Sequence, residues 1–430
     1  MHDRRDLLQA HRLMTHRMSQ ALLCGEPDSR NRPLRRMYAA SACSVLLGVI
    51  AASVFAAVGL FLPSQGHLAG LNQPGTLVVD TNTATAFVPC AGGELCPAMN
   101  MASALLALDS PGTTRRVTVT TSALAGYVIG PPVGIAGLPP VLPAASDLVR
   151  GPWSVCAADG ATVLVGGVST RGRVLGPSDA ALVSAGGGEW LLWDSTRLAI
   201  QSAVAQTLFA AAPVNVPLAW LDSLPRGPDF AAPVLPGGGQ LVAGPSGADA
   251  VAGQVYVQQS PPQFYVLTAD GRLAPVTPVA AALLERVSGA QPAQPISPSM
   301  AAADLGGAPV QTGGLPATVP HIAGASTAMC AVYGAGSGSA LTVSGTVPSG
   351  GETSGAVRAW FPPGGGALVS SAQEWFLLTG AHRYLVPSAA AAQALGYDAS
   401  RDAVALPATV TDLLTPGPAL NLAAAKLPAG

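Results

Sequence analysis

The chain has 430 residues, of which 10% are charged and 49% are hydrophobic, and its formal net charge is −2. About a quarter of the residues of an ordinary soluble protein are charged. A nucleic-acid-binding protein needs a basic surface, so this composition argues against that class. The 50 glycines and 39 prolines indicate many turns and close packing of small side chains.

Residues 1–36 form a short basic head. Eight arginines and four acidic residues give it a net charge of +4. Residues 3–24 have the spacing of an amphipathic helix, with these apolar side chains on one face: Leu7, Met14, Met18 and Leu22. We interpret this helix as a docking helix for a cytosolic partner. A helix that lies on anionic membrane lipid is the alternative.

Residues 37–62 read MYAASACSVLLGVIAASVFAAVGLFL and contain no charged side chain. A helix rises about 1.5 Å per residue, so this segment is long enough to cross a hydrocarbon core of about 30 Å. Basic residues beside a first span stay in the cytoplasm. We therefore predict that the head is cytoplasmic and that residues 63–430, with a net charge of −6, are extracytoplasmic. A cleaved signal peptide is the alternative, although its apolar region would be shorter.

The cysteines follow the same division. Cys24 and Cys43 belong to the head and the span, and four more lie in the predicted extracytoplasmic part. An even number of cysteines in an oxidising compartment indicates disulfides, and four allow three pairings. Cys90 and Cys96 flank the short loop AGGEL, and their pairing would leave Cys156 with Cys330. A metal site is the alternative, but no CxxC motif or nearby histidine pair supports it.

Weak internal repeats occur after residue 74. The motifs EWLL (189–192) and EWFL (374–377) open two similar stretches. Each continues through a turn to an arginine, then to an alanine-rich helix that starts at a serine, and then to a Leu-x-x-Gly-Pro element. In the first stretch these are Arg197, Ser202 and 224–228, and in the second they are Arg383, Ser388 and 414–418. Further copies are predicted near 264–267 and over 75–108. Each copy is a β-hairpin plus a helix and is too small to be stable alone, so we expect the copies to pack together.

The predicted fold is therefore α+β. A single N-terminal transmembrane helix precedes an extracytoplasmic domain of four β-hairpin/helix repeats around a β-rich central core. The predicted segments are the head 1–36, span 37–62, linker 63–74, repeat 1 at 75–125, first core part 126–160, repeat 2 at 161–235, repeat 3 at 250–310, second core part 311–345, and repeat 4 with the tail at 346–430.

The sequence offers little for catalysis. A Walker A loop needs a lysine, and the single lysine is Lys426, outside any glycine-rich loop. The three histidines that follow the span, His67, His321 and His382, form no HExxH motif, and no serine lies in a GxSxG elbow. The carboxylates Asp80, Asp194, Asp222, Asp229 and Asp270 lie mostly beside turn residues and are interpreted as turn formers. We predict no catalytic residue, metal site or cofactor.

Several collinear motifs resemble the EccB family of actinobacterial type VII (ESX) secretion membrane proteins. They are RDLLQAHRLMTHRMSQALLCGEPD in the head, LCPAMNMASALLAL (95–108), PPVGIAGLPPVLP (131–143), WSVC (153–156), WLDSLPRGPD (220–229), FYVLTADG (264–271), LPATVP (315–320) and GYDASRDAVALPATVTDLLTPGPALNLAAA (396–425). The resemblance implies a single-pass inner-membrane protein with a cytoplasmic N-terminus and a disulfide between Cys156 and Cys330. It also implies a complex with EccC-, EccD- and EccE-like subunits, near a mycosin protease, in which the chain is a homo-oligomer.

We therefore predict a structural subunit that anchors and scaffolds the extracytoplasmic side of the secretion pore. Two alternatives remain. Some family members are labelled ATPases, which would make ATP a ligand, although no residue here supports hydrolysis. A cell-wall-binding module would need exposed aromatic side chains, for which the candidates are Trp153, Trp190, Trp193, Trp220, Trp360 and Trp375. Core packing is the expected role of Trp153, and of Trp190 and Trp375, which we place at equivalent repeat positions.

Overall fold

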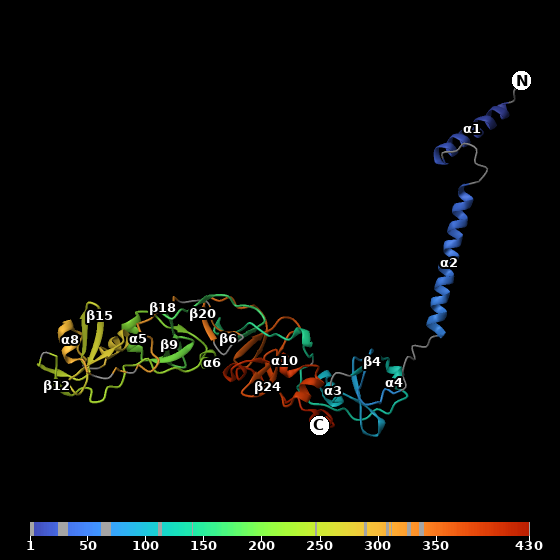
Figure 1. The fold of residues 1–430 in the computed structure, drawn as a ribbon. Coiled ribbons are helices and arrows are strands. Elements are labelled where there is room, and N and C mark those ends of the chain that lie inside the picture. Colours follow the sequence, from blue (N-terminus) through green and yellow to red (C-terminus); the bar gives the residue numbers. More distant parts are fainter. Residues whose placement is uncertain are drawn as a thin grey trace. The chain divides into compact units, whose positions relative to one another are not determined.

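The structure is a computed structural model and describes residues 4–24, 33–61, 70–110, 114–139, 141–245, 247–287, 290–306, 309–310, 312–324, 328–334 and 339–429. These residues fall into two units (Figure 1). The helical unit ends at Gly70, and the β-rich unit begins at Leu71. Most of the predicted linker 63–74, including His67, lies outside the described residues.

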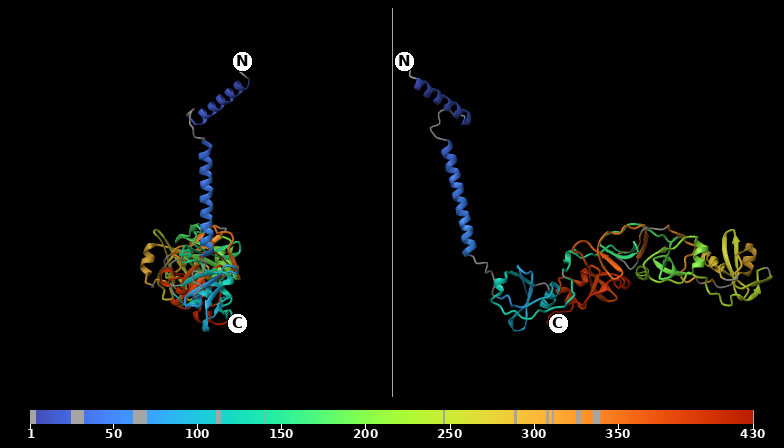
Figure 2. Two further views of the ribbon diagram at one scale, coloured as in Figure 1. Left: turned by 90° about the vertical axis from the view of Figure 1, so that its right-hand side faces the viewer. Right: turned by 180° about the vertical axis from the view of Figure 1, so that it is seen from behind.

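The helical unit contains α1 (Arg4–Cys24) and α2 (Pro33–Phe61). Both views in Figure 2 show α2 as one uninterrupted helix. Its segment Met37–Val54 is long and apolar enough to cross a membrane, and no other helix of the described residues meets that test. The helix begins before the predicted span 37–62, because Pro33 suits the first position of a helix and arginine is a good helix former.

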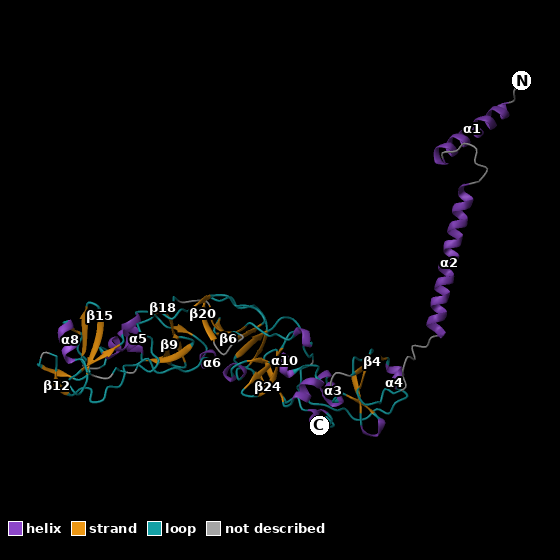
Figure 3. Cartoon of the chain, viewed as in Figure 1, coloured by secondary structure: helices purple, strands orange, loops and turns teal. Residues whose placement is uncertain are grey.

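A seven-stranded central sheet forms the middle of the β-rich unit (Figure 3). Its strands come from distant parts of the chain. In spatial order they are β21 (Glu352–Ser354), β22 (Val357–Trp360), β6 (Ala161–Gly166), β5 (Trp153–Ala158), β19 (Ala328–Tyr333), β20 (Ser339–Val343) and β7 (Arg173–Val174). Cys156 and Cys330 lie directly opposite each other in the antiparallel pair β5–β19.

Each of four repeats has three antiparallel strands, a helix, a short strand parallel to the first strand, and a second helix. Repeat 1 has β1 (Thr76–Asp80), β2 (Ala86–Pro89), β3 (Leu95–Pro97), α3 (Met101–Leu108), β4 (Arg115–Val119) and α4 (Thr121–Leu124). Repeat 2 has β8 (Asp179–Ala185), β9 (Gly188–Trp193), β10 (Thr196–Ile200), α5 (Ser202–Phe209), β11 (Val214–Asn215) and α6 (Leu218–Ser223), and β18 (His321–Ile322) also pairs with β8.

Repeat 3 follows the same order, and repeat 4 has one further helix, α10, before its parallel strand. Repeat 3 has β14 (Val255–Gln259), β15 (Pro262–Leu267), β16 (Leu273–Val276), α7 (Pro278–Leu284), β17 (Gln294–Ile296) and α8 (Pro298–Asp304), preceded by a hairpin of β12 (Leu241–Ala243) and β13 (Asp249–Val251). Repeat 4 has β23 (Ala367–Ser371), β24 (Glu374–Thr379), β25 (His382–Val386), α9 (Ala389–Ala394), α10 (Ala399–Asp402), β26 (Val404–Ala405), α11 (Ala408–Thr411) and β27 (Thr415–Pro416), and α12 (Leu422–Ala425) ends the chain.

The predicted fold class is confirmed, because one N-terminal apolar helix precedes a β-rich remainder. The predicted repeat is incomplete. The three copies at 189–192, 264–267 and 374–377 lack the first strand, the copy over 75–108 lacks the third strand, and all four lack the parallel strand. Two boundaries also differ. Residues 161–174 were assigned to repeat 2 and 352–360 to repeat 4, but both segments pair within the central sheet. Short apolar strands of this kind have no periodicity that separates them from their neighbours.

The predicted equivalence of Trp190 and Trp375 is wrong by one residue. Arg197 pairs with Leu192, and Arg383 pairs with Leu378, so the register matches Trp190 with Phe376. Two-residue turns with positive φ join the first and second strands in both repeats, and these turns fix the register. A shift of one residue reverses the face of a strand. Trp190 accordingly packs against the central core, whereas Trp375 packs against repeat 1 and repeat 4 side chains.

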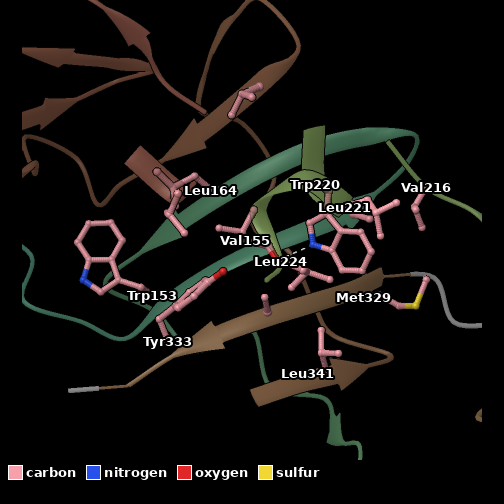
Figure 4. Close-up of a cluster of buried hydrophobic side chains, with 14 of the residues drawn as sticks. Trp153, Val155, Leu164, Val216, Trp220, Leu221, Leu224, Met329, Tyr333 and Leu341 are labelled. Carbon is pink, nitrogen blue, oxygen red and sulfur yellow. Dashed lines mark hydrogen bonds between the residues drawn. The ribbon is translucent and has the colours of Figure 1, made fainter. Parts of the chain in front are cut away.

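One core joins the central sheet to repeats 2 and 4. Trp220 of α6 is fully buried there and donates its Nε1–H to the carbonyl oxygen of Val155, 2.9 Å away (Figure 4). The matching helix α11 lies against α6, where Thr409 donates to the carbonyl oxygen of Ser223. Repeat 1 packs on repeat 4 through Leu106, and repeat 3 packs on repeat 2 through Leu283. The contacts therefore run from repeat 1 through repeat 4, the central sheet and repeat 2 to repeat 3.

A buried carboxylate ties the segment before β5 to repeat 4. Asp402 is 1% exposed and accepts hydrogen bonds from Arg150 (2.8 Å) and Arg401 (3.0 Å) and from the backbone N–H of Asp398 (2.9 Å). The hydrogen bonds from Arg401, Asp398 and Arg150 hold the pKa of Asp402 below its usual range. The ionised form is therefore the one that the folded chain stabilises.

Replacing Cys156 and Cys330 together by alanine should lower the melting temperature far more than replacing Cys90 and Cys96. The sequence separations are 174 and 6 residues. In the chain-entropy model the first disulfide contributes about 5 kcal/mol and the second about 2 kcal/mol. Thermal unfolding of the two double variants in the same detergent measures the difference. Equal losses would contradict a dominant role of the long-range disulfide.

The substitution Asp402→Asn should destabilise the fold by about 1–3 kcal/mol at neutral pH, because buried charge-assisted hydrogen bonds are lost. The folded pKa lies below the unfolded value of about 4, so the contribution of Asp402 is present above that pH and disappears as the pH falls. Thermal unfolding of wild type and variant between neutral and acidic pH measures the effect. Asp229→Asn is the control, since Asp229 and its partner Arg226 are both exposed. A difference that persists at low pH would contradict the assignment.

Candidate functional site

The structure contains both disulfides that the sequence predicts. Cys156 and Cys330 are fully buried in the central sheet. Cys90 and Cys96 join the two sides of the β2–β3 turn in repeat 1. Of the other two cysteines, Cys43 is free and exposed, and the side chain of Cys24 lies outside the described part.

A pocket of about 650 Å³ lies beside the Cys90–Cys96 disulfide. Its walls come from the β2–β3 turn, the end of α3 and the C-terminal segment, with Glu94 and Lys426 as the charged lining residues. Lys426 donates to Asp109 over 3.2 Å. The lysine that a nucleotide-binding loop would need is therefore engaged in an ion pair that links the C-terminal segment to repeat 1.

The four side chains predicted as a docking face of α1 are all exposed. The exposed fractions are 65% for Leu7, 70% for Met14, 66% for Met18 and 88% for Leu22. Their spacing of seven, four and four residues places them along one side of the helix. Within the described helical unit this apolar stripe is exposed to solvent, as a helix that docks on another protein or on lipid requires.

Histidines form no catalytic or metal-binding group in the described residues. His321 is exposed at the edge strand β18. His382 approaches Glu352, with Nδ1 and Oε1 3.2 Å apart, at the contact between β25 and the central sheet. No group of three histidine, cysteine or acidic side chains that could hold a metal was found among the residues described.

Most of the carboxylates named from the sequence stabilise turns. Asp80 accepts hydrogen bonds from the backbone N–H of Asn82 and from the hydroxyls of Thr121 and Thr83, and these bonds lower its pKa. The hydroxyl of Thr268 likewise lowers the pKa of Asp270 in the β15–β16 turn. Asp194 has a positive φ in the β9–β10 turn. Lowered pKa values keep Asp80 and Asp270 ionised, which is unsuited to a general acid near neutral pH.

The other two carboxylates belong to ion pairs, and one of these pairs recurs. In repeat 2, Arg197 pairs with Asp222 and lies over the ring of Trp190, with Cζ 5.4 Å from the ring centroid. In repeat 4, Arg383 pairs with Asp412 and lies over Phe376 at the same distance. The arginines are 17% and 21% exposed.

This arrangement was not predicted, although both arginines were identified as repeat positions. Its signal is the aspartate that lies two residues before the leucine of each Leu-x-x-Gly-Pro element, at Asp222 and Asp412. The arrangement joins the third strand of each repeat to the helix that follows the short parallel strand, α6 in repeat 2 and the C-terminal end of α11 in repeat 4, and equivalent positions do so in both repeats. Repetition of this kind indicates a packing device rather than a reaction centre.

None of the six tryptophans has an exposed side chain. Trp153 and Trp220 are buried, and the other four are partly buried. Tyr333 lies in the same core as Trp153, and burial raises its pKa to about 12. The tryptophans predicted for a glycan-binding groove therefore present only part of their side chains to solvent, and Trp153 and Trp220 present almost none.

Comparisons with known proteins identify a family and individual relatives that this chain resembles. The family model described as "Type VII secretion system ESX-1, transport TM domain B" matches residues 2–429. The protein named ESX-3 secretion system ATPase EccB3 from Mycolicibacterium smegmatis is 31% identical over 265 residues, which are 55% of this chain and 49% of that protein. ESX-5 secretion system ATPase EccB5 from Mycobacterium tuberculosis is 28% identical over 318 residues, 68% of this chain and 61% of that protein.

Solved structures share the fold. A chain of an intact ESX-5 inner membrane complex matches with a TM-score of 0.66 and 22% identity, covering all of this chain and 96% of that one. An EccB3 dimer from the ESX-3 core complex matches with a TM-score of 0.63 and 24% identity, covering 82% of this chain and 99% of that one. In the sequence comparison, the chain spans about half the length of the EccB3 relative. The family model, which extends over almost every residue, shows that this chain belongs to the EccB family of type VII secretion membrane proteins.

Proposed function

We propose that the chain is a structural subunit of a type VII secretion inner-membrane complex, where it anchors and scaffolds the extracytoplasmic side of the export pore. The observation that carries this proposal is the match of the family model to residues 2–429. The described residues agree with it: they include one helix that is long and apolar enough to span a membrane, and the polar side chains of the β-rich unit stabilise turns and contacts between elements. The structural relatives support it, since their titles describe an ESX-5 inner membrane complex and an EccB3 dimer.

The proposed topology has the N-terminus in the cytoplasm and the β-rich unit outside. Arginines precede α2, and basic residues beside a span favour the cytoplasmic side. The β-rich unit holds both disulfides, which persist in an oxidising compartment. The two arguments are independent and give the same orientation.

The cytoplasmic contacts are assigned to α1. Its exposed stripe of Leu7, Met14, Met18 and Leu22 would pack against an EccC-, EccD- or EccE-like subunit. The extracytoplasmic contacts, including those with further copies of this chain and with a mycosin protease, would be made by the β-rich unit. Burial of each apolar side chain of the stripe would contribute about 1.5–3 kcal/mol, enough to hold the helix on a partner.

ATP hydrolysis is the second candidate, because the relatives carry the word ATPase in their names. The described residues give it no support, since Lys426 is paired with Asp109. ATP turnover by the purified full chain above a no-protein blank would favour this candidate.

The stripe on α1 gives the test of the scaffold proposal. Chains carrying Leu7→Ser, Met14→Ser, Met18→Ser and Leu22→Ser should insert in the membrane normally but recover about tenfold less of the other complex subunits in an affinity purification, because the apolar contact is lost. A matched control carries Gln9→Ser and Gln20→Ser on the opposite face of α1. Protein identification after purification of both variants provides the measurement.

Equal recovery of partner subunits by the stripe variant and the control would remove α1 from the assembly contacts. Recovery of no partner subunit even by the wild-type chain would contradict the scaffold proposal itself.

A further inference from the structure

A pocket of about 300 Å³ lies on repeat 4, beside the ion pair between Arg383 and Asp412. Phe376 and Glu374, both on β24, contribute to its walls. Pro416 of β27 also lines it. The pocket is therefore built on the arginine, aspartate and aromatic ring that repeats 2 and 4 share.

Strand pairing fixes which positions of the two repeats correspond. The hairpins β8–β9 and β23–β24 align turn on turn. Beyond them, Arg383 pairs with Pro416. The equivalent Arg197 bridges to Arg226. Four differences occur among the residues that line the pocket, given with the repeat 4 residue first: Glu374 for Gly188, Phe376 for Trp190, Ala408 for Leu218 and Pro416 for Arg226.

In repeat 2, larger side chains occupy the equivalent space. A Cβ at Gly188 would lie 3.3 Å from Nε1 of Trp190, and a Cβ at Gly186 would lie 3.3 Å from a methyl group of Leu218. The guanidinium of Arg226 lies over the Trp190 ring, with Cζ 5.8 Å from the centroid. Repeat 4 has phenylalanine, alanine and proline at the positions of the indole, the leucine and the arginine, which explains why a pocket forms there.

Repeat 4 also adds a carboxylate to the pocket where repeat 2 has a glycine. The Glu374 side chain is exposed, and the described part of the chain provides it with no hydrogen-bond or ion-pair partner. Asp412 is 59% exposed and is paired with Arg383. Two carboxylates against one guanidinium leave an excess of one negative charge. A cationic group is favoured beside such carboxylates and over an aromatic ring.

We infer that the repeat 4 pocket binds an arginine side chain of a partner protein, as repeat 2 holds Arg226 of its own chain. The planar guanidinium stacks on Phe376 and donates paired hydrogen bonds to Glu374. Arg226 makes the same two kinds of contact, with the Trp190 ring and, over 3.1 Å, with Asp229. Lysine has no planar face and satisfies only the charge.

The size of the pocket favours a side chain over a free small molecule. About 300 Å³ is the lower limit for small-molecule sites. In repeat 2 the equivalent space is filled by side chains of the polypeptide itself. The expected partner is a protein that presents an arginine with no acidic residue beside it. This inference rests on the proposed function, because it assigns one extracytoplasmic contact of the scaffold to a defined pocket.

Titration of the purified full-length chain in detergent with the blocked tripeptide acetyl-Gly-Arg-Gly-amide, followed by saturation-transfer NMR, tests the pocket. Matched peptides carry citrulline, lysine or leucine in place of arginine. The arginine peptide should bind about tenfold more tightly than the citrulline peptide, which has nearly the same shape without the charge. It should also bind more tightly than the lysine and leucine peptides.

Two substitutions locate the binding. Pro416→Arg should fill the pocket from within, as Arg226 does in repeat 2, and weaken binding of the arginine peptide about tenfold. Pro416→Ser is the matched control, which leaves the pocket open and should bind like the wild type. Glu374→Gln keeps the size of an exposed side chain and should weaken binding about fivefold, because the hydrogen bonds to the guanidinium lose one of their charges.

The assignment would be overturned if the arginine peptide did not bind the wild-type chain, if it bound no better than the citrulline or leucine peptide, or if Pro416→Arg and Glu374→Gln both left its affinity unchanged. If the other complex subunits were still recovered with the wild-type chain, the scaffold proposal would stand without this pocket. Binding of the arginine peptide by a chain that recovers no subunit would contradict the scaffold proposal alone.

Discussion

The pairing of β5 with β19 is the contact on which the rest of the β-rich unit depends. It joins two segments 174 residues apart, and the Cys156–Cys330 disulfide lies at a directly opposed pair within it. Every strand of the central sheet is placed relative to these two. Repeats 2 and 4 then pack on that sheet through Trp220, Leu224, Val410 and Leu414, and repeats 3 and 1 pack on repeats 2 and 4.

A sheet assembled from such distant segments carries a large loop-closure entropy. The disulfide removes much of that entropy from the unfolded chain. Each repeat also has to cover the exposed edges of its own three-stranded sheet. Its short parallel strand pairs with the first strand, and a later segment of the chain bridges to the third strand.

The sequence was sufficient for the features that local chemistry determines. Cysteine parity and the AGGEL loop indicated both disulfides, and Leu-x-x-Gly-Pro marked equivalent positions. In the structure, Gly227 donates to the carbonyl of Arg197, as Gly417 does to that of Arg383. The sequence alone did not predict the register of the strands or the pairing of strands that are far apart in the chain. The shared Glu-Trp dipeptide suggested that Trp190 matches Trp375, whereas the two-residue turns set the register one position away. The sequences of β6 and β22 gave no sign that these strands pair in parallel, with partners 195 residues apart.

The candidate functional residues are ion pairs that hold elements of the β-rich unit together and an exposed apolar face on α1. Arg197 with Asp222, Arg383 with Asp412, and Asp402 with Arg150 hold elements of the β-rich unit together, and the α1 stripe is left for partners. Purification of the full-length chain from its native membrane in mild detergent, with identification of the co-purified proteins, tests this account most directly. Recovery of EccC-, EccD- and EccE-like proteins in one large particle is the predicted result. Recovery of the chain alone, or with cell-wall fragments, would contradict it.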